Sequence, residues 1–195
     1  GGQGDRPGGG QDLLHARVGN LVHHAAALGL PLLQRLPSEE LGEEQLLAEA
    51  LGGRIGVASK PEVGIAEVKL SGLGRRHGMT NGLKPTLKVM QWHHAEVQEL
   101  PEGAEVLATS PITKVQIMAV ADTLLATQFH AELTPALIER WAHIPQYIDW
   151  LNEALGPDAY PRVRAKALPL MPQLERMSRT LFNNLIEGKA LRQAA

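Results

Sequence analysis

The stretch Lys114-Val-Gln-Ile-Met-Ala-Val-Ala-Asp-Thr-Leu-Leu-Ala-Thr-Gln-Phe-His-Ala-Glu132 decides the fold of this chain. Its two apolar runs, 114–120 and 124–129, flank three turn-like residues and predict a hairpin. The second run ends in a histidine and a carboxylate. Because residues i and i+2 of an extended chain point the same way, we expect His130 and Glu132 to lie side by side. Such a pair can orient an imidazole as general base for a nucleophile.

The composition limits what this chain can do. With 195 residues, 44% hydrophobic and 21% charged, it is large enough for a domain with a real core. A net charge of −2 and the lack of a basic stripe argue against a nucleic-acid partner. No apolar run approaches the roughly 18 residues of a membrane span, so we expect no membrane association and a cytoplasmic location. With no cysteine, the sequence has no disulfide and no thiol nucleophile.

The rest of the chain alternates helical and strand patterns. Apolar spacing predicts helices over 12–28 and 43–51, the second followed by Gly52-Gly53 as a stop. Thr134-Pro135 predicts a helix start, Pro145 a break in that helix, and 161–184 a helical segment bent at two prolines, Pro169 and Pro172. Further strands are expected at 30–33, 65–70, 87–92 and 105–109. This order predicts a layered α/β domain with a C-terminal helical extension.

Five stretches, in order along the chain, resemble the class I glutamine amidotransferases of the GMP synthase type. They are Gln45-Leu-Leu-Ala-Glu-Ala-Leu-Gly-Gly53, Lys60-Pro-Glu-Val-Gly64, Gln91-Trp-His-His94, Leu100 to Ser110, and Gln128-Phe-His-Ala-Glu132. The resemblance implies a three-layer flavodoxin-like α/β fold with a mostly parallel central sheet.

The resemblance also implies a division of the chain. Residues 1–10, six of them glycine, are expected to be a flexible segment, because they lack the apolar surface that would offset ordering. Residues 11–156 would be the amidotransferase-like domain and 157–195 the C-terminal helical extension. If Gly1-Gly2 is the remnant of the family's oxyanion-hole turn, the first strands of the central sheet are missing from this chain.

In that family a cysteine thiolate attacks the side-chain amide of glutamine and a Cys-His-Glu triad carries the hydrolysis. The resemblance makes His130 the base and Glu132 its partner. It makes Gln45 a residue that helps to hold substrate, and it gives His93 a substrate-binding role, with a structural role as the alternative. No cofactor is implied. The expected ligand is glutamine or a γ-glutamyl compound, and the expected protein partners are a synthetase or a second copy of the chain.

The chain departs from the family at the nucleophile. Counting back four residues from Gln45 puts Leu41 where the cysteine belongs, and Glu43 where the family has a glycine. Ser38 is the nearby hydroxyl, and nothing in the sequence places it on a sharp turn. The sequence therefore predicts an inactive amidotransferase-like protein. The competing hypothesis is a non-catalytic module that binds glutamine, a γ-glutamyl compound or a protein partner; a γ-glutamyl hydrolase would fail for the same lack of a nucleophile.

Other candidate residues have structural interpretations. A two-histidine, one-carboxylate metal site could use His93, His130 and Glu132, but the resemblance explains them without metal. The tryptophans at 92, 141 and 150 are expected to pack in the core and not to form a stacking platform. Glu62 either stabilises its turn or shapes the site.

Overall fold

The structure is a computed structural model that describes residues 43–120 and 124–193. These residues belong to one compact unit, Leu41–Ala195. The expected glycine-rich segment 1–10, helix 12–28 and strand 30–33 lie outside the described residues, as do Ser38 and Leu41.

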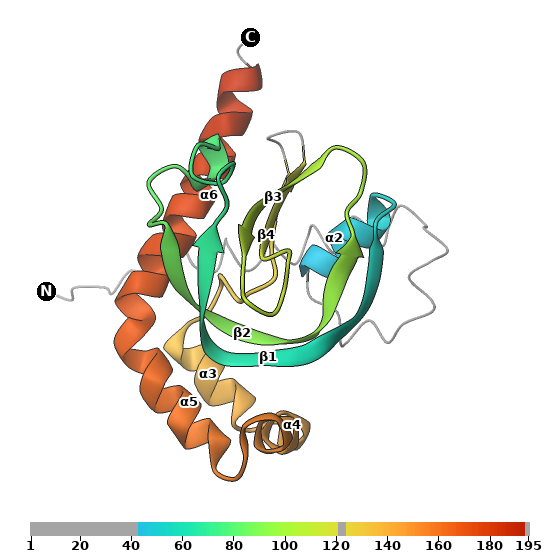
Figure 1. Cartoon of the computed structure of the whole chain (residues 1–195). Coiled ribbons are helices and arrows are strands. Elements are labelled where there is room, and N and C mark those ends of the chain that lie inside the picture. The colour runs from blue at the N-terminus through green and yellow to red at the C-terminus, as the bar shows by residue number, and fades with distance from the viewer. Residues whose placement is uncertain (1–42, 121–123, 194–195) are drawn as a thin grey trace, which may run out of the picture. The chain divides into compact units, whose positions relative to one another are not determined.

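The described elements follow one another as strands between helices (Figure 1). They are α2 (Glu43–Ala50), β1 (Arg54–Leu70), the 3-10 turn η2 (Gly78–Thr80), β2 (Thr86–Glu99), β3 (Ala104–Thr109), β4 (Ile117–Val120), β5 (Leu124–Thr127), α3 (Pro135–Trp141), α4 (Pro145–Leu155), α5 (Ala159–Ala167), the 3-10 turn η3 (Leu168–Leu170) and α6 (Met171–Gln193).

The five described strands form one sheet in the order β2-β1-β3-β4-β5, and every neighbouring pair is antiparallel. The expected hairpin between β4 and β5 is confirmed by its register, Val120 opposite Leu124. The expectation of a mostly parallel, flavodoxin-like sheet is wrong for this part of the chain. Parallel neighbours need a crossover of a dozen or more residues, usually a helix. Here only short links join β3, β4 and β5, and the 71–85 link between β1 and β2 holds only a 3-10 turn.

A bulge bends the long ribbon of β1 and β2, which Figure 1 shows curving beneath the other strands. Val57 pairs with Ala95 and Glu62 with His93, so residues 58–61 face His94 alone on β2. Extra residues in one strand bend the ladder and increase its twist. Pro61, which has no N–H to donate, falls within this bulge, where a proline costs the sheet no ladder bond.

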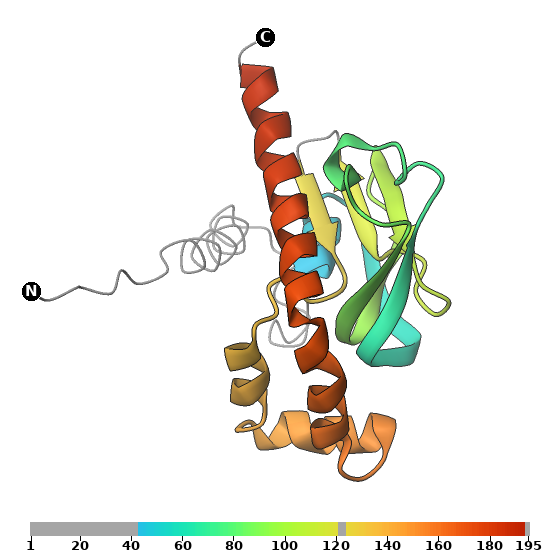
Figure 2. The same cartoon turned by 90° about the vertical axis from the view of Figure 1, so that its left-hand side faces the viewer.

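Helices cover both faces of the sheet. Met118 on β4 packs with Ala48 of α2 in one apolar cluster. Ile117 and Ala119, its neighbours in the strand, face a larger cluster that holds buried residues of α3, α4, α5 and α6. Alternate residues of a strand point to opposite faces, so one short strand serves both clusters. In Figures 1 and 2, α6 runs along one side of the strands and projects past them.

Local signals placed the helix ends correctly. Leu137 N–H donates to Thr134 Oγ1 at 3.1 Å, which confirms the predicted cap. Pro145 begins α4, and Pro169 lies in η3 between α5 and α6. Gly52 ends α2 with φ of 89°, a conformation that glycine adopts without strain.

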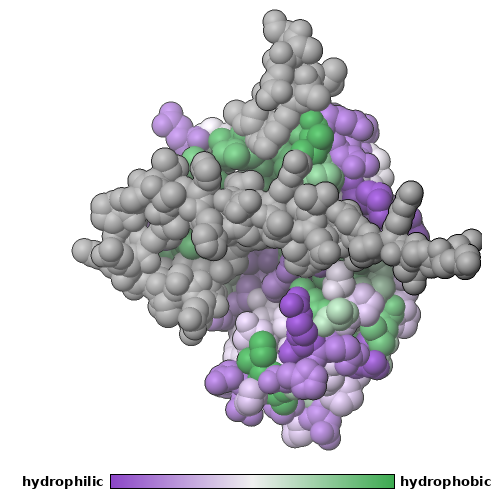
Figure 3. Space-filling model, turned by 180° about the vertical axis from the view of Figure 1, so that it is seen from behind, coloured by the Kyte–Doolittle hydropathy of each residue, from purple (hydrophilic) through white to green (hydrophobic). Residues whose placement is uncertain are grey.

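The surface of the described residues is mixed. Large apolar side chains are exposed at scattered positions: Leu51, Val57, Leu73, Leu100, Ile112, Leu155 and Ile186. Where the rear face is uncovered in Figure 3, apolar areas are separated by polar ones. Among the described residues, no helix has the length and apolar character needed to cross a membrane.

Two glycines in the link between β1 and β2 test the packing of this turn. A Cβ on Gly74 would lie 1.9 Å from the carbonyl oxygen of Leu107, whereas a Cβ on Gly72 would meet nothing within 4 Å. We expect Gly74→Ala to lower the free energy of unfolding by about 1–3 kcal/mol, because backbone would have to move. Gly72→Ala should change it by less than about 0.5 kcal/mol. Urea denaturation measures both, and an unchanged midpoint for Gly74→Ala would contradict the packing described.

Candidate functional site

The loop after β5 brings His130 and Glu132 together. Their Nδ1 and Oε1 atoms lie 2.6 Å apart, and both side chains are about one-third exposed. A carboxylate can only accept, so Nδ1 of His130 carries the proton and donates it. Nε2 is then the nitrogen that can accept a proton from another group. The backbone N–H of His130 donates to the carbonyl of Met90 at 2.9 Å, and its ring meets Trp141 edge-on at 5.1 Å.

The other two predicted site residues meet at a single backbone carbonyl. Gln45, buried in α2, donates from Nε2 to the oxygen of Ala95 at 3.1 Å. His93 Nδ1 lies 3.0 Å from the same oxygen and must donate to it, since a carbonyl only accepts. The Oε1 atom of Gln45 is buried and has no hydrogen-bond partner among the described residues. A buried acceptor of this kind is a place where a ligand donor would be stabilised.

Glu62 forms the centre of a buried polar network that joins three strands. Its Oε2 accepts from Gln116 Nε2 at 2.7 Å and from Ser110 Oγ at 2.9 Å, and it lies 3.4 Å from His93 Nε2. The side chain is 4% exposed, so these contacts replace water. Gln91 Nε2 donates to Gln116 Oε1 at 2.7 Å and extends the network along β2.

The network keeps Glu62 charged. Burial alone would raise the pKa of this carboxyl, but hydrogen bonds from His93 and Ser110 outweigh burial and hold the pKa below its ordinary value of 4.5. The sequence had singled out Glu62 without choosing between a turn and the site. No sequence signal indicated Ser110, Gln91 or Gln116 as its partners, because they lie far away along the chain.

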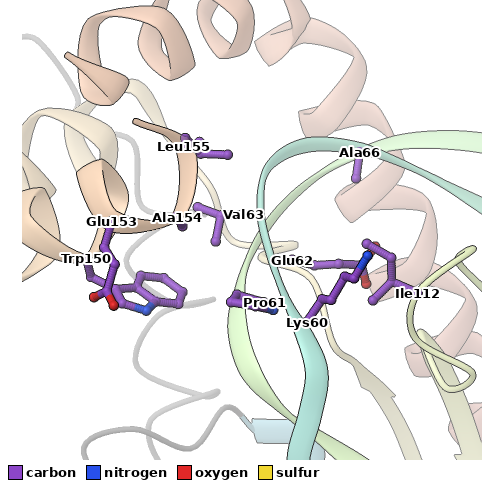
Figure 4. A pocket seen from close by; sticks show the side chains of 10 residues that line it. All are labelled: Lys60, Pro61, Glu62, Val63, Ala66, Ile112, Trp150, Glu153, Ala154 and Leu155. Carbon is purple, nitrogen blue, oxygen red and sulfur yellow. The ribbon is translucent and has the colours of Figure 1, made fainter. Parts of the chain in front are cut away.

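The expected tryptophans pack against one another and connect the site to a hollow. Trp92 lies 4.7 Å from Trp141 and 5.5 Å from Trp150, measured between ring centroids. Trp150 in turn lines a hollow of about 620 Å³ at the bend of β1. Figure 4 shows Trp150 and Leu155 on one side of the strand and Glu62 on the other.

Metal binding has no support in the described part of the chain. Within residues 43–120 and 124–193, no three histidine, cysteine, aspartate or glutamate side chains gather closely enough to hold an ion. The alternative metal site of His93, His130 and Glu132 therefore lacks its geometry. Leu41, where the family pattern places the nucleophile, lies outside the described residues.

The antiparallel sheet flanked by helices, with a histidine held by a glutamate at the end of a strand, defines an amidotransferase type of protein. Residues 42–140 match the glutamine amidotransferase class-I family. The chain belongs to that family.

Relatives within the family narrow the resemblance. The chain is 38% identical over 118 residues to a glutamine-hydrolyzing GMP synthase subunit of Sulfurisphaera tokodaii, covering 60% of this chain and 58% of that protein. It is 35% identical over 127 residues to the corresponding GMP synthase subunit of Methanothermobacter thermautotrophicus, covering 65% of this chain and 63% of that protein. The chain therefore spans somewhat less than two thirds of these relatives.

Solved structures share the fold. A glutamine amidotransferase from Thermotoga maritima matches with a TM-score of 0.65 and 20% identity, over 96% of this chain and 75% of that one. A glutamine amido transferase from Methylobacillus flagellatus matches with a TM-score of 0.63 and 20% identity, over 74% of this chain and 59% of that one.

The charge on Glu62 predicts a pH-dependent stability. Glu62→Gln removes the charge and disturbs buried hydrogen bonds, so we expect a loss of about 1–3 kcal/mol at neutral pH. The folded-state pKa of Glu62 lies below 4.5, so its contribution is complete above about pH 4.5 and is lost as the pH falls below that value.

The measurement is urea denaturation of both proteins from pH 3 to 7. The stability difference should shrink at the acidic end. Glu67→Gln, an exposed carboxylate on the same strand, is the control and should change stability by less than about 0.5 kcal/mol. A difference that grows on acidification would show that the sign is wrong.

Proposed function

We propose that this chain is an amidotransferase-like protein whose ancestral reaction is hydrolysis of the glutamine side-chain amide to glutamate and ammonia. We further propose that the chain as given does not turn glutamine over. The observation that carries this proposal is the 2.6 Å pair of His130 and Glu132 in a segment matched to the family, in a sequence that contains no cysteine.

The chemistry explains why the pair alone is insufficient. In the family reaction a thiolate forms a glutamyl thioester, and the histidine first accepts a proton and then delivers one to the departing ammonia. His130 has the partner needed for that role, and its Nε2 is left to exchange the proton. Leucine at position 41 offers no nucleophilic atom. Loss of the nucleophile from a triad removes many orders of magnitude of rate.

A non-catalytic binding role is the second candidate, and Gln45 favours it. The family resemblance gives this residue a part in holding substrate, and its Oε1 is a buried acceptor without a partner among the described residues. An ammonium or amide donor of glutamine, or of a γ-glutamyl compound, would satisfy that atom. His93 holds the Ala95 carbonyl that anchors Gln45, so it would support the same pocket.

A protein partner also follows from the relatives. Two of them are named as single subunits of GMP synthase, which implies that those proteins work with a further subunit. We propose that a synthetase is the partner of this chain, with a dimer of the chain as the alternative. A mass measurement in solution on the chain alone tests the alternative, since a single-copy mass would remove it.

Activity and binding are tested on the same preparations. We expect glutamate release from glutamine to stay at background for the wild-type chain, because no thiol is present. Turnover that disappears in His130→Ala but persists in His143→Ala, an exposed histidine of the α3–α4 link, would overturn the proposed inactivity.

Calorimetric titration with glutamine and with glutamate tests the binding role. We expect heat of binding with at least one of them, reduced at least tenfold in affinity by Gln45→Ala, whose side chain holds the unpaired acceptor. Silence with both ligands would count against the binding role.

A further inference from the structure

The two halves of the His130–Glu132 pair are anchored by different parts of the fold. The loop from Gln128 to Thr134 leaves β5 and enters α3. On its first side it is tied to strands: Gln128 N–H donates to Gln116 O at 3.0 Å, and His130 N–H donates to Met90 O at 2.9 Å. These bonds fix where the imidazole begins. They do not fix the peptide unit from which Glu132 departs.

That second half is held by α6. The carbonyl oxygen of Ala131, the residue between His130 and Glu132, accepts a hydrogen bond from the hydroxyl of Ser178. This carbonyl belongs to the peptide plane that leads into Glu132. Since the plane is rigid, its orientation sets the direction in which the Glu132 side chain leaves the backbone. The carboxylate must point correctly for Oε1 to reach Nδ1 at 2.6 Å.

The helix that carries Ser178 is itself held in place. Leu174, Met177 and Leu181 are buried in the larger apolar cluster and fix which face of α6 meets the sheet. Less than two turns beyond Ser178, Asn184 Nδ2 donates to Met79 O at 3.0 Å and to Asn81 O at 2.8 Å. These bonds fix the helix along its axis. Ser178 is thus placed from both sides.

From this geometry we infer that Ser178 is a positioning residue for the His130–Glu132 pair and that α6 sets the alignment of the pair through the Ala131 carbonyl. The inference rests on the proposed function only in giving the pair its purpose. Without the Ser178 hydroxyl, the Ala131–Glu132 peptide gains freedom, and the carboxylate spends less time at hydrogen-bond distance from the imidazole.

The chain supplies a matched control on the same helix. Ser178 Oγ also contacts the carbonyl four residues back, Leu174 O, at 3.0 Å. Thr180 Oγ1 makes the equivalent contact with Arg176 O at 2.9 Å. Removing either hydroxyl therefore has the same effect within the helix. Only the Ser178 variant also removes the bond to the His130–Glu132 loop.

The readout is the proton on His130 Nδ1, observed by NMR in the full chain with 15N-labelled histidine. A short N–H···O bond to a charged acceptor deshields its proton and slows its exchange. The chain has eight histidines, so the resonance is assigned by its loss in His130→Gln and in Glu132→Gln. A change in global stability alone does not move this signal.

We expect Ser178→Ala to shift the His130 resonance upfield and to raise its exchange rate severalfold, while Thr180→Ala leaves both unchanged. Ser178→Thr, which keeps the hydroxyl, should restore the wild-type signal. If Ser178→Ala does not fold, Ser178→Cys offers a near-isosteric, weaker donor and should shift the resonance in the same direction. An unshifted resonance in either folded variant, or an equal shift in Thr180→Ala, would overturn the inference.

The same samples separate this inference from the proposed function. If wild-type protein binds neither glutamine nor glutamate, the binding role fails while the His130 resonance still tests Ser178. If the chain binds ligand but the resonance does not respond to Ser178→Ala, the positioning role fails and the binding role stands.

Discussion

The carboxylate of Glu62 is the charge around which the bent sheet is assembled. It lies at the bulge of β1 and accepts from Ser110 and Gln116, which approach it from the far side of the sheet. An isolated charge at this depth would cost several kcal/mol. Its hydrogen bonds offset that cost only if β1, β2 and the residues between β3 and β4 keep their positions. The bend of the ribbon and the charge therefore stabilise one another.

Through His93, this network reaches the residues that the family uses for substrate. His93 joins Glu62 to the Ala95 carbonyl, and that carbonyl also holds Gln45 of α2. The His130–Glu132 pair is held separately, by β2 on one side and α6 on the other. A rigid sheet thus supports two polar groups, each of which depends on more than one element for its geometry.

Local features of this chain were predictable because their causes lie within a few residues. The cap at Thr134, the breaks at Pro145 and Pro169, and the glycine stop of α2 all follow from backbone chemistry at those residues. The first half of β1 was missed, because glycine and Pro61 interrupt the alternation that marks a strand. The direction of the strands was wrong, because pairing is decided between segments and family resemblance was carried over to a sheet that these residues build differently.

The sequence by itself determined the family, the absence of a thiol and the spacing that brings His130 beside Glu132. These depend on residue identity and on short-range geometry. Only the tertiary structure decided that the described sheet is antiparallel, that Gln45 and His93 share one carbonyl, and that Ser178 reaches the loop of the pair. Each of these contacts joins residues about 45 or more positions apart, or segments whose order along the chain does not reveal their order in space. Such contacts are selected by the packing of the whole core, which no local pattern encodes.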